Sequence, residues 1–101
     1  MDLIKQLLNL KNELKYEFRD FPRNCCMEAV KRASDFGLEE TFGLFIDDYG
    51  IGHNHHWSRK NGKIYDITAF QFGNKFPEVY VLDENSSEAE KHYEEGIYLM
   101  I

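Results

Sequence analysis

The 101-residue sequence contains only two cysteines, two prolines and one tryptophan. The cysteines, Cys25 and Cys26, are adjacent, so they cannot join distant parts of the fold, and a small disulfide-stabilised scaffold is excluded. Basic residues are also few, because 12 Lys and Arg stand against 18 Asp and Glu, for a formal net charge of −6. A protein that binds nucleic acid by following its phosphates is therefore not expected.

Long hydrophobic runs are absent as well. No segment approaches the ~18 consecutive apolar residues of a membrane-spanning helix, and the first ten residues carry Asp2 and Lys5, unlike a secretory signal. Hydrophobic residues nevertheless make up 43% of the chain, which is too many for a disordered protein. We therefore expect one globular domain over residues 1–101, located in the reducing cytoplasm and not associated with a membrane.

The first third of the chain has the apolar spacing of helices. In residues 2–18, leucines recur every three or four positions after a helix-capping Asp2, which predicts an amphipathic helix. A second helix is expected over residues 25–36, because Asn24 is a favourable N-cap and Gly37 a favourable residue just beyond a helix end.

After Gly37 the pattern changes to strands. Asn61-Gly62 is the strongest signal in the chain for a two-residue hairpin turn. The expected strands are 41–46, 55–59, 63–68 and 78–82, separated by a loop over 47–54 and a turn-rich segment over 72–76, and followed by a helix over 86–95 that Gly96 ends and an edge strand over 97–101. Helices followed by antiparallel strands indicate an α+β protein.

The hairpin turn determines which side chains share a face of the sheet. Counting outward from a two-residue turn pairs Trp57 with Asp66. Because side chains alternate between faces, one face carries His55, Trp57, Asp66 and Thr68. We favour His55 as the partner of Asp66, but a slip of one residue would place His56 opposite Asp66, so His56 stays an alternative.

These residues are the types that make up a thiol nucleophile. A cysteine thiol has a pKa of about 8.5 and reacts as the thiolate, which a helix N-terminus and an imidazolium stabilise. A histidine can also protonate the leaving group, and a carboxylate on its other nitrogen fixes its orientation. We therefore predict Cys26 as nucleophile, His55 as base and acid, and Asp66 as the orienting carboxylate. Cys25 stays an alternative, although Cys26 lies on the helix face turned toward the sheet.

The histidines permit a second interpretation. Residues of metal-binding types are His53, His55, His56, Asp47 and Asp48, together with the two cysteines. Their spacing matches no familiar zinc signature, so we expect no metal and no other cofactor.

Three segments of the chain resemble a known superfamily. They are Phe21-Pro22 with Cys25, Cys26 and Ala29; His55-His56-Trp57; and residues 62–72, Gly-Lys-Ile-Tyr-Asp-Ile-Thr-Ala-Phe-Gln-Phe. This order is similar to that of small bacterial and phage proteins of the papain-like/transglutaminase-like superfamily, over roughly residues 18–93. The resemblance implies a minimal papain-like core, with N-terminal helices packed on a small antiparallel sheet, and a site made by Cys26, His55 and Asp66.

Members of this superfamily are peptidases, amidases, transglutaminases, deamidases or acyltransferases. The resemblance thus implies a cysteine-dependent hydrolase or acyl-transferase for an amide or ester bond of a protein or peptide, with Trp57 and Gln71 as candidate substrate contacts. Papain-like enzymes often carry a glutamine shortly before the cysteine, where this chain has Arg19 and Asp20. The alternative is a catalytically inactive binding protein, of inhibitor, immunity or anti-defence type, that acts on a basic partner through its acidic surface.

Overall fold

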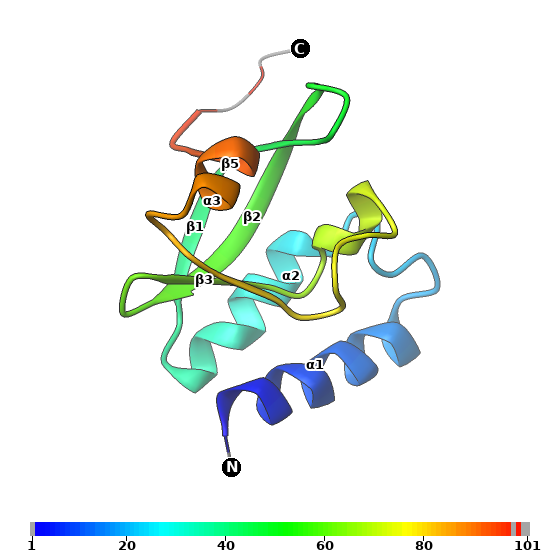
Figure 1. Cartoon of the computed structure of the whole chain (residues 1–101). Helices are drawn as coiled ribbons and strands as arrows, with labels where there is room; N and C mark the ends of the chain where they lie inside the picture. The colour runs from blue at the N-terminus through cyan, green and yellow to red at the C-terminus, as the bar shows by residue number, and fades with distance from the viewer. Residues whose placement is uncertain (1, 98, 100–101) are drawn as a thin grey trace.

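Residues 2–97 and 99 are described by the structure, a computed structural model. The strands form one antiparallel sheet in the order β4-β3-β2-β1-β5, and α1 and α2 lie side by side next to it (Figure 1). This arrangement confirms the expected α+β class. The elements are α1 (Leu3–Glu17), α2 (Cys26–Ala33), the 3-10 helix η1 (Ser34–Phe36), β1 (Glu39–Ile46), β2 (Gly52–Lys60), β3 (Lys63–Asp66), the 3-10 helix η2 (Ala69–Phe72), β4 (Tyr80–Asp83), α3 (Ser87–His92) and β5 (Tyr93–Glu95).

Helix α1 begins as the sequence predicts. The carboxylate of Asp2 accepts a hydrogen bond from the backbone N–H of Lys5 at 3.1 Å, which is the arrangement of a helix N-cap. The buried face of α1 consists mainly of Leu7, Leu10 and Leu14, which pack with residues of α2 into one of two hydrophobic clusters. Each leucine removed from water contributes about 2 kcal/mol, so this face holds α1 against α2.

Helix α2 begins one residue later than predicted. Asn24 is not its N-cap, because Asn24 has a left-handed backbone with φ of 59°, a conformation that asparagine tolerates better than most residues. The N-cap is Cys25, and Cys26 is therefore the first helical residue rather than the second. The predicted end is also wrong in part, since α2 stops at Ala33 and its last expected turn is the 3-10 helix η1. Gly37 follows with φ of 85°, the predicted terminating conformation.

The hairpin between β2 and β3 has the predicted register. Asn61 and Gly62 both have positive φ, 52° and 77°, as a two-residue turn of this kind requires. Lys60 pairs with Lys63, so the alternation predicted for β2 and β3 applies. Strand β2 is longer than predicted, because it begins at Gly52 and pairs with the whole of β1. The expected loop over 47–54 is thus shortened to a turn.

The expected C-terminal helix is only partly present. Ser86 is the N-cap of α3, but the helix ends at His92, and Tyr93–Glu95 forms β5 at the open edge of β1. Ala89 and Tyr93 lie four residues apart and are both buried or half-buried, a spacing that a continued helix would share. The sequence pattern therefore could not locate the change from helix to strand, and Gly96 follows a strand rather than a helix.

The edge strand expected over 97–101 cannot be judged as a whole. Residues 98, 100 and 101 lie outside the described residues, and Ile97 and Leu99 are not in a strand. The backbone N–H of Leu99 donates to the side chain of Asn54 at 2.7 Å, so this segment does contact β2.

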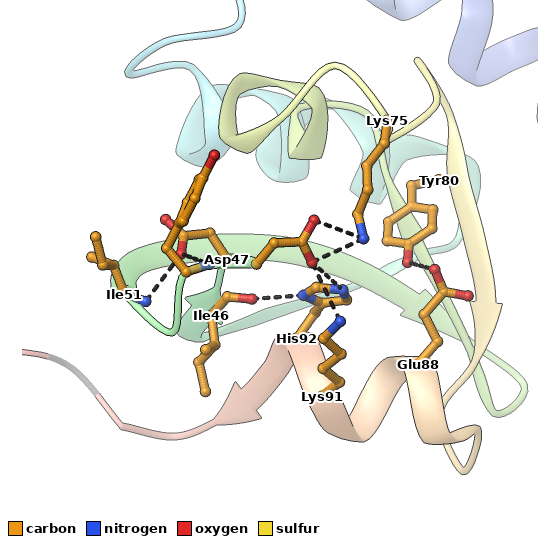
Figure 2. Close-up of polar contacts among 10 residues, drawn as sticks. Ile46, Asp47, Ile51, Lys75, Tyr80, Glu88, Lys91 and His92 are labelled. Carbon is orange, nitrogen blue, oxygen red and sulfur yellow. Dashed lines mark hydrogen bonds and ion pairs between the residues drawn. The ribbon is translucent and has the colours of Figure 1, made fainter.

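Helix α3 is fixed to the end of β1 by a buried histidine. Figure 2 shows His92, whose Nδ1 lies 2.6 Å from the carbonyl oxygen of Ile46. The imidazole of His92 also stacks on Phe45, with ring centroids 5.3 Å apart. Phe45 is fully buried at the centre of the second hydrophobic cluster, between β1, η2, α3 and β5. This packing joins β5 to the sheet face that carries His55.

Within the described part of the chain, none of the helices has the length and apolar character that crossing a membrane requires.

Candidate active site

A buried histidine–aspartate pair joins β2 to β3. Nε2 of His55 lies 2.7 Å from Oδ2 of Asp66, and the two side chains are 0% and 1% exposed. His55 is in β2 and Asp66 is the last residue of β3, so the hairpin register brings them together. A hydrogen bond between ionised partners is strong when water is excluded. The pair is thus a fixed unit of the fold.

The carboxylate of Asp66 is surrounded by donors. Its Oδ2 accepts from His55 and also from the hydroxyl of Tyr93 at 2.8 Å. Its Oδ1 accepts from the backbone N–H of Thr68 at 2.9 Å and from the Thr68 hydroxyl at 3.3 Å. Burial would raise the pKa of Asp66, but the charge and hydrogen bond of His55, with the bonds from Thr68 and Tyr93, lower it. Asp66 therefore stays ionised although it is buried.

His55 is held as an imidazolium at neutral pH. Burial by itself lowers the pKa of His55, but the charge and hydrogen bond of Asp66 and the interaction with Cys26 raise it to about 9. Because Nε2 is bonded to Asp66, Nδ1 is the nitrogen left for the thiol. Nδ1 is buried and makes no hydrogen bond of standard geometry among the described residues.

The two cysteines have different surroundings. Cys26 is partly exposed, and although burial raises the pKa of its thiol, the interaction with His55 and a hydrogen bond from the backbone of His56 lower it below the ordinary value. Cys25 is only 4% exposed, and burial, followed by the charges of Cys26 and Asp20, raises the pKa of its thiol. Cys26 is thus the thiol that solvent reaches and that ionises more readily.

The start of α2 adds backbone donors beside Cys26. The N-cap Cys25 makes no side-chain capping bond in the described part of the chain, and Cys26 opens the helix. The N–H groups of a first turn have no partner within their own helix and carry partial positive charge. They can therefore stabilise negative charge on an oxygen atom bound next to the thiol.

A groove of about 460 Å³ lies between α2 and the β1–β2 strands. The lining residues are Met27, Glu28, Val30, Lys31, Glu40 and His56. Met27 follows Cys26 directly and is 65% exposed, and Phe42, whose ring lies against His56, is 49% exposed. Burial, and then the positive charge of His55, lower the pKa of His56. The alternative His56 therefore faces this groove, whereas His55 is the histidine bonded to Asp66.

The two predicted substrate contacts lie in different places. Trp57 is buried in the core, with its ring centroid 4.9 Å from that of Tyr93 and 6.1 Å from that of His55. Trp57 therefore packs beside His55 of the His55–Asp66 pair from the interior of the protein. Gln71 is half-buried in η2. Contact of either residue with a substrate stays a prediction.

The residues considered for a metal are engaged elsewhere. Asp47 accepts a hydrogen bond from the backbone N–H of Ile51 (Figure 2). Its carboxylate also lies 2.9 Å from Nε2 of His53, so Asp47 closes the β1–β2 turn. Asp48 forms ion pairs with Lys75 at 2.8 Å and with Lys91 at 3.4 Å. In the part of the chain that the structure describes, no group of three His, Cys, Asp or Glu side chains could hold a metal ion.

Tyr93 is the contact of Asp66 that the sequence pattern missed. The segment Asp83–Glu95 reads as the solvated face of an acidic helix, yet Tyr93 lies in β5 and bonds to the buried carboxylate. One signal was available: Tyr93 is an aromatic residue in an otherwise acidic run, which is unusual for a solvated surface. Its partner lies 27 residues earlier in the chain, and the spacing gives no indication of that contact.

Comparisons of this chain with protein-family models, with curated proteins and with solved structures find no match. The functional interpretation rests on the side chains and their geometry.

Proposed function

We propose that the protein is a cysteine-dependent hydrolase or acyl-transferase of papain-like/transglutaminase-like type, acting on an amide or ester bond. The observation that carries the proposal is the buried His55–Asp66 pair beside the partly exposed Cys26 thiol, whose pKa is lowered. A thiolate next to an imidazolium combines a strong nucleophile with an acid for the leaving group.

In the first half of the reaction, the Cys26 thiolate attacks the substrate carbonyl carbon, and the carbonyl electron pair moves onto oxygen. The first-turn N–H groups of α2 donate to that oxygen. When the carbonyl re-forms, the bond to the amine or alcohol breaks, and His55 gives its Nδ1 proton to the leaving group. The products are a thioester on Cys26 and a neutral His55.

In the second half, His55 takes a proton from water or from an acceptor amine, which attacks the thioester. The tetrahedral species collapses, the Cys26 thiolate leaves, and His55 is again an imidazolium. Throughout, Asp66 holds the Nε2–H of His55 at 2.7 Å and thereby keeps Nδ1 directed toward the thiol. Water yields hydrolysis or deamidation, and an amine yields transamidation.

The groove between α2 and the β1–β2 strands favours a peptide or protein substrate. It is open along α2 and about 460 Å³ in volume, with Met27 and Val30 as apolar walls and Glu40 as a polar one. An extended chain can lie in such an open groove, one wall of which is Met27, the residue that follows Cys26, whereas a deep closed pocket would favour a small molecule.

The test uses p-nitrophenyl acetate as an acyl donor and follows nitrophenol release together with the site of acetylation by peptide mass mapping. We expect a burst of product and acetyl on Cys26 in the wild type and in the control Cys25→Ser. Cys26→Ser should lose both signals, and His55→Ala should lose most of the rate. Acetylation of Cys25, or a rate that is unchanged in Cys26→Ser, would refute the proposal.

A second candidate is a binding protein that keeps this fold without catalysis. The observation in its favour is an excess of acid on one surface, where Arg59 forms ion pairs with Glu39, Glu84 and Glu95. Three carboxylates around one guanidinium leave net negative charge for a basic partner. Cys26→Ser separates the two candidates, since a biological effect that survives in the folded variant favours binding and one that is lost favours catalysis.

A further inference from the structure

Tyr93 and His55 donate to the same oxygen atom. Oδ2 of Asp66 lies 2.7 Å from Nε2 of His55 and 2.8 Å from the hydroxyl of Tyr93, whereas Oδ1 is occupied by Thr68. The negative charge of Oδ2 is therefore divided between an imidazolium and a phenol.

The position of Tyr93 depends on a close approach of two backbones. Tyr93 is in β5, which pairs with β1 through Gly43, Leu44 and Phe45. A Cβ atom at Gly43 would lie inside the contact distance of the Glu94 carbonyl, so only glycine lets β5 come this near. The ring of Tyr93 then packs edge-on against Phe45, with centroids 5.1 Å apart, and its hydroxyl reaches Asp66.

We propose that Tyr93 is a positioning residue, which fixes Oδ2 of Asp66 and limits how tightly that oxygen holds the proton of His55. Its meaning for catalysis rests on the proposed function, but its effect on His55 does not. The edge strand β5 would then be part of the active site, although it lies at the opposite end of the chain from Cys26.

The physical reason is competition between donors. The hydroxyl hydrogen of Tyr93 brings partial positive charge to Oδ2, next to the Nε2–H of His55. Without that hydrogen, Oδ2 is more basic and stabilises the imidazolium more strongly. His55 would then be a weaker acid toward the leaving group. Burial and the charge of Asp66 raise the pKa of Tyr93 well above its ordinary value, so the hydroxyl stays a donor.

Other titratable groups interact electrostatically with the His55–Asp66 pair or with Tyr93. They are Cys26 from α2, His56 from β2, Tyr80 from β4 and Glu88 from α3. Tyr80 is useful for comparison, because it is a buried tyrosine of the hydrophobic cluster against which Tyr93 packs. Its hydroxyl donates to Glu88 and not to Asp66 (Figure 2).

The experiment is an NMR pH titration of the His55 imidazole in the wild type, Tyr93→Phe and the matched control Tyr80→Phe. Phenylalanine keeps the ring packing, and urea unfolding verifies that each variant is folded. We expect the titration midpoint of His55 to rise by about half a pH unit in Tyr93→Phe and to stay unchanged in Tyr80→Phe. A midpoint that does not move in Tyr93→Phe, or moves equally in both variants, would overturn the proposal.

A kinetic measurement relates this effect to the reaction. With a peptide anilide, whose leaving group needs a proton, we expect Tyr93→Phe to lower kcat several-fold with little change in KM. If the wild type has no activity on ester or amide but the midpoint still rises in Tyr93→Phe, the proposed function fails while the inference about Tyr93 stands. If the midpoint is unchanged in Tyr93→Phe and the wild type is active, the inference about Tyr93 fails while the proposed function stands.

Discussion

Cys25 and Cys26 are consecutive residues whose thiols have opposite shifts of pKa. Cys25 is the buried N-cap of α2, and burial raises the pKa of its thiol. Cys26 is the first helical residue, and His55 lowers the pKa of its thiol. Cys25 precedes the helix and has a non-helical backbone, with φ of −111° and ψ of 0°, so the two thiols point in different directions, that of Cys25 into the core and that of Cys26 toward the His55–Asp66 pair.

The first prediction concerns the selectivity of alkylation. At pH 7, iodoacetamide should modify Cys26 at least about tenfold faster than Cys25, because only the thiolate reacts and only Cys26 is both accessible and lowered in pKa. Peptide mapping of the folded protein after short exposure measures the two rates separately. Cys25→Ser should retain the fast phase, and equal rates at the two cysteines would contradict the prediction.

The second prediction concerns the source of the Cys26 thiolate. In His55→Ala, the apparent pKa of alkylation should return to about 8.5 or higher, because burial persists and the imidazolium is gone. His56→Ala is the matched control. The His56 side chain lies in the groove and its backbone N–H remains, so the pH profile should be nearly that of the wild type. A profile unaffected by His55→Ala would show that the pair does not activate the thiol.

The sequence was sufficient for the local part of this arrangement. Asn61-Gly62 determines the register of β2 and β3, and strand alternation then places His55 and Asp66 on one face. Both steps depend on residues only a few positions apart, where turn chemistry and periodicity are strong. The choice of His55 over His56 follows from them.

The parts that the sequence did not determine depend on distant contacts. Tyr93 can belong to β5 because Gly43, fifty residues earlier in the sequence, lets the backbone of Glu94 approach closely. A side chain at position 43 would clash with that backbone. Similarly, Asn24 is a good N-cap in general, but here it has a left-handed backbone, and Cys25 occupies the N-cap position without a side-chain capping bond among the described residues. For Tyr93, a contact distant in the sequence outweighs the local pattern, whereas for Asn24 one local preference, the left-handed backbone, replaces another, the N-cap.

The third prediction concerns the pH dependence of stability. The folded pKa of His55 is about 9, above an unfolded value of 6.5, so its contribution is complete below pH 6.5 and is lost as pH rises toward 9. The folded pKa of Cys26 is below its unfolded value, so its contribution is gained as pH rises toward about 8.5. Between pH 6.5 and 8 the two contributions change with pH in opposite directions, so the free energy of unfolding should fall less steeply with rising pH than the contribution of His55 alone would.

Replacing Cys26 should leave only the contribution of His55 to the pH dependence of the free energy of unfolding. In Cys26→Ser, His55 remains paired with Asp66, so the free energy of unfolding should fall with rising pH, by up to about 1 kcal/mol per pH unit. Urea unfolding of both proteins at about pH 6.5, 7.25 and 8 measures the free energy of unfolding at and above the unfolded pKa of histidine, which is roughly 6.5. If the free energy of unfolding of the wild type falls with rising pH as steeply as that of Cys26→Ser, the Cys26 thiol is not ionised in the folded protein.

The last prediction tests the close approach that places Tyr93. Gly43→Ala should destabilise the protein by about 3 kcal/mol, because the new methyl group would displace the backbone of Glu94 and with it β5. Gly52→Ala is the matched control, since Gly52 is also in the sheet and a Cβ there makes only ordinary contact with Leu44, 3.5 Å away. This control should be neutral or stabilising by about 0.5 kcal/mol. If Gly43→Ala stays folded, the titration midpoint of His55 should rise as in Tyr93→Phe, because a displaced β5 withdraws the same hydroxyl from Asp66. Equal stability of the two alanine variants in urea would show that β5 does not dock against Gly43.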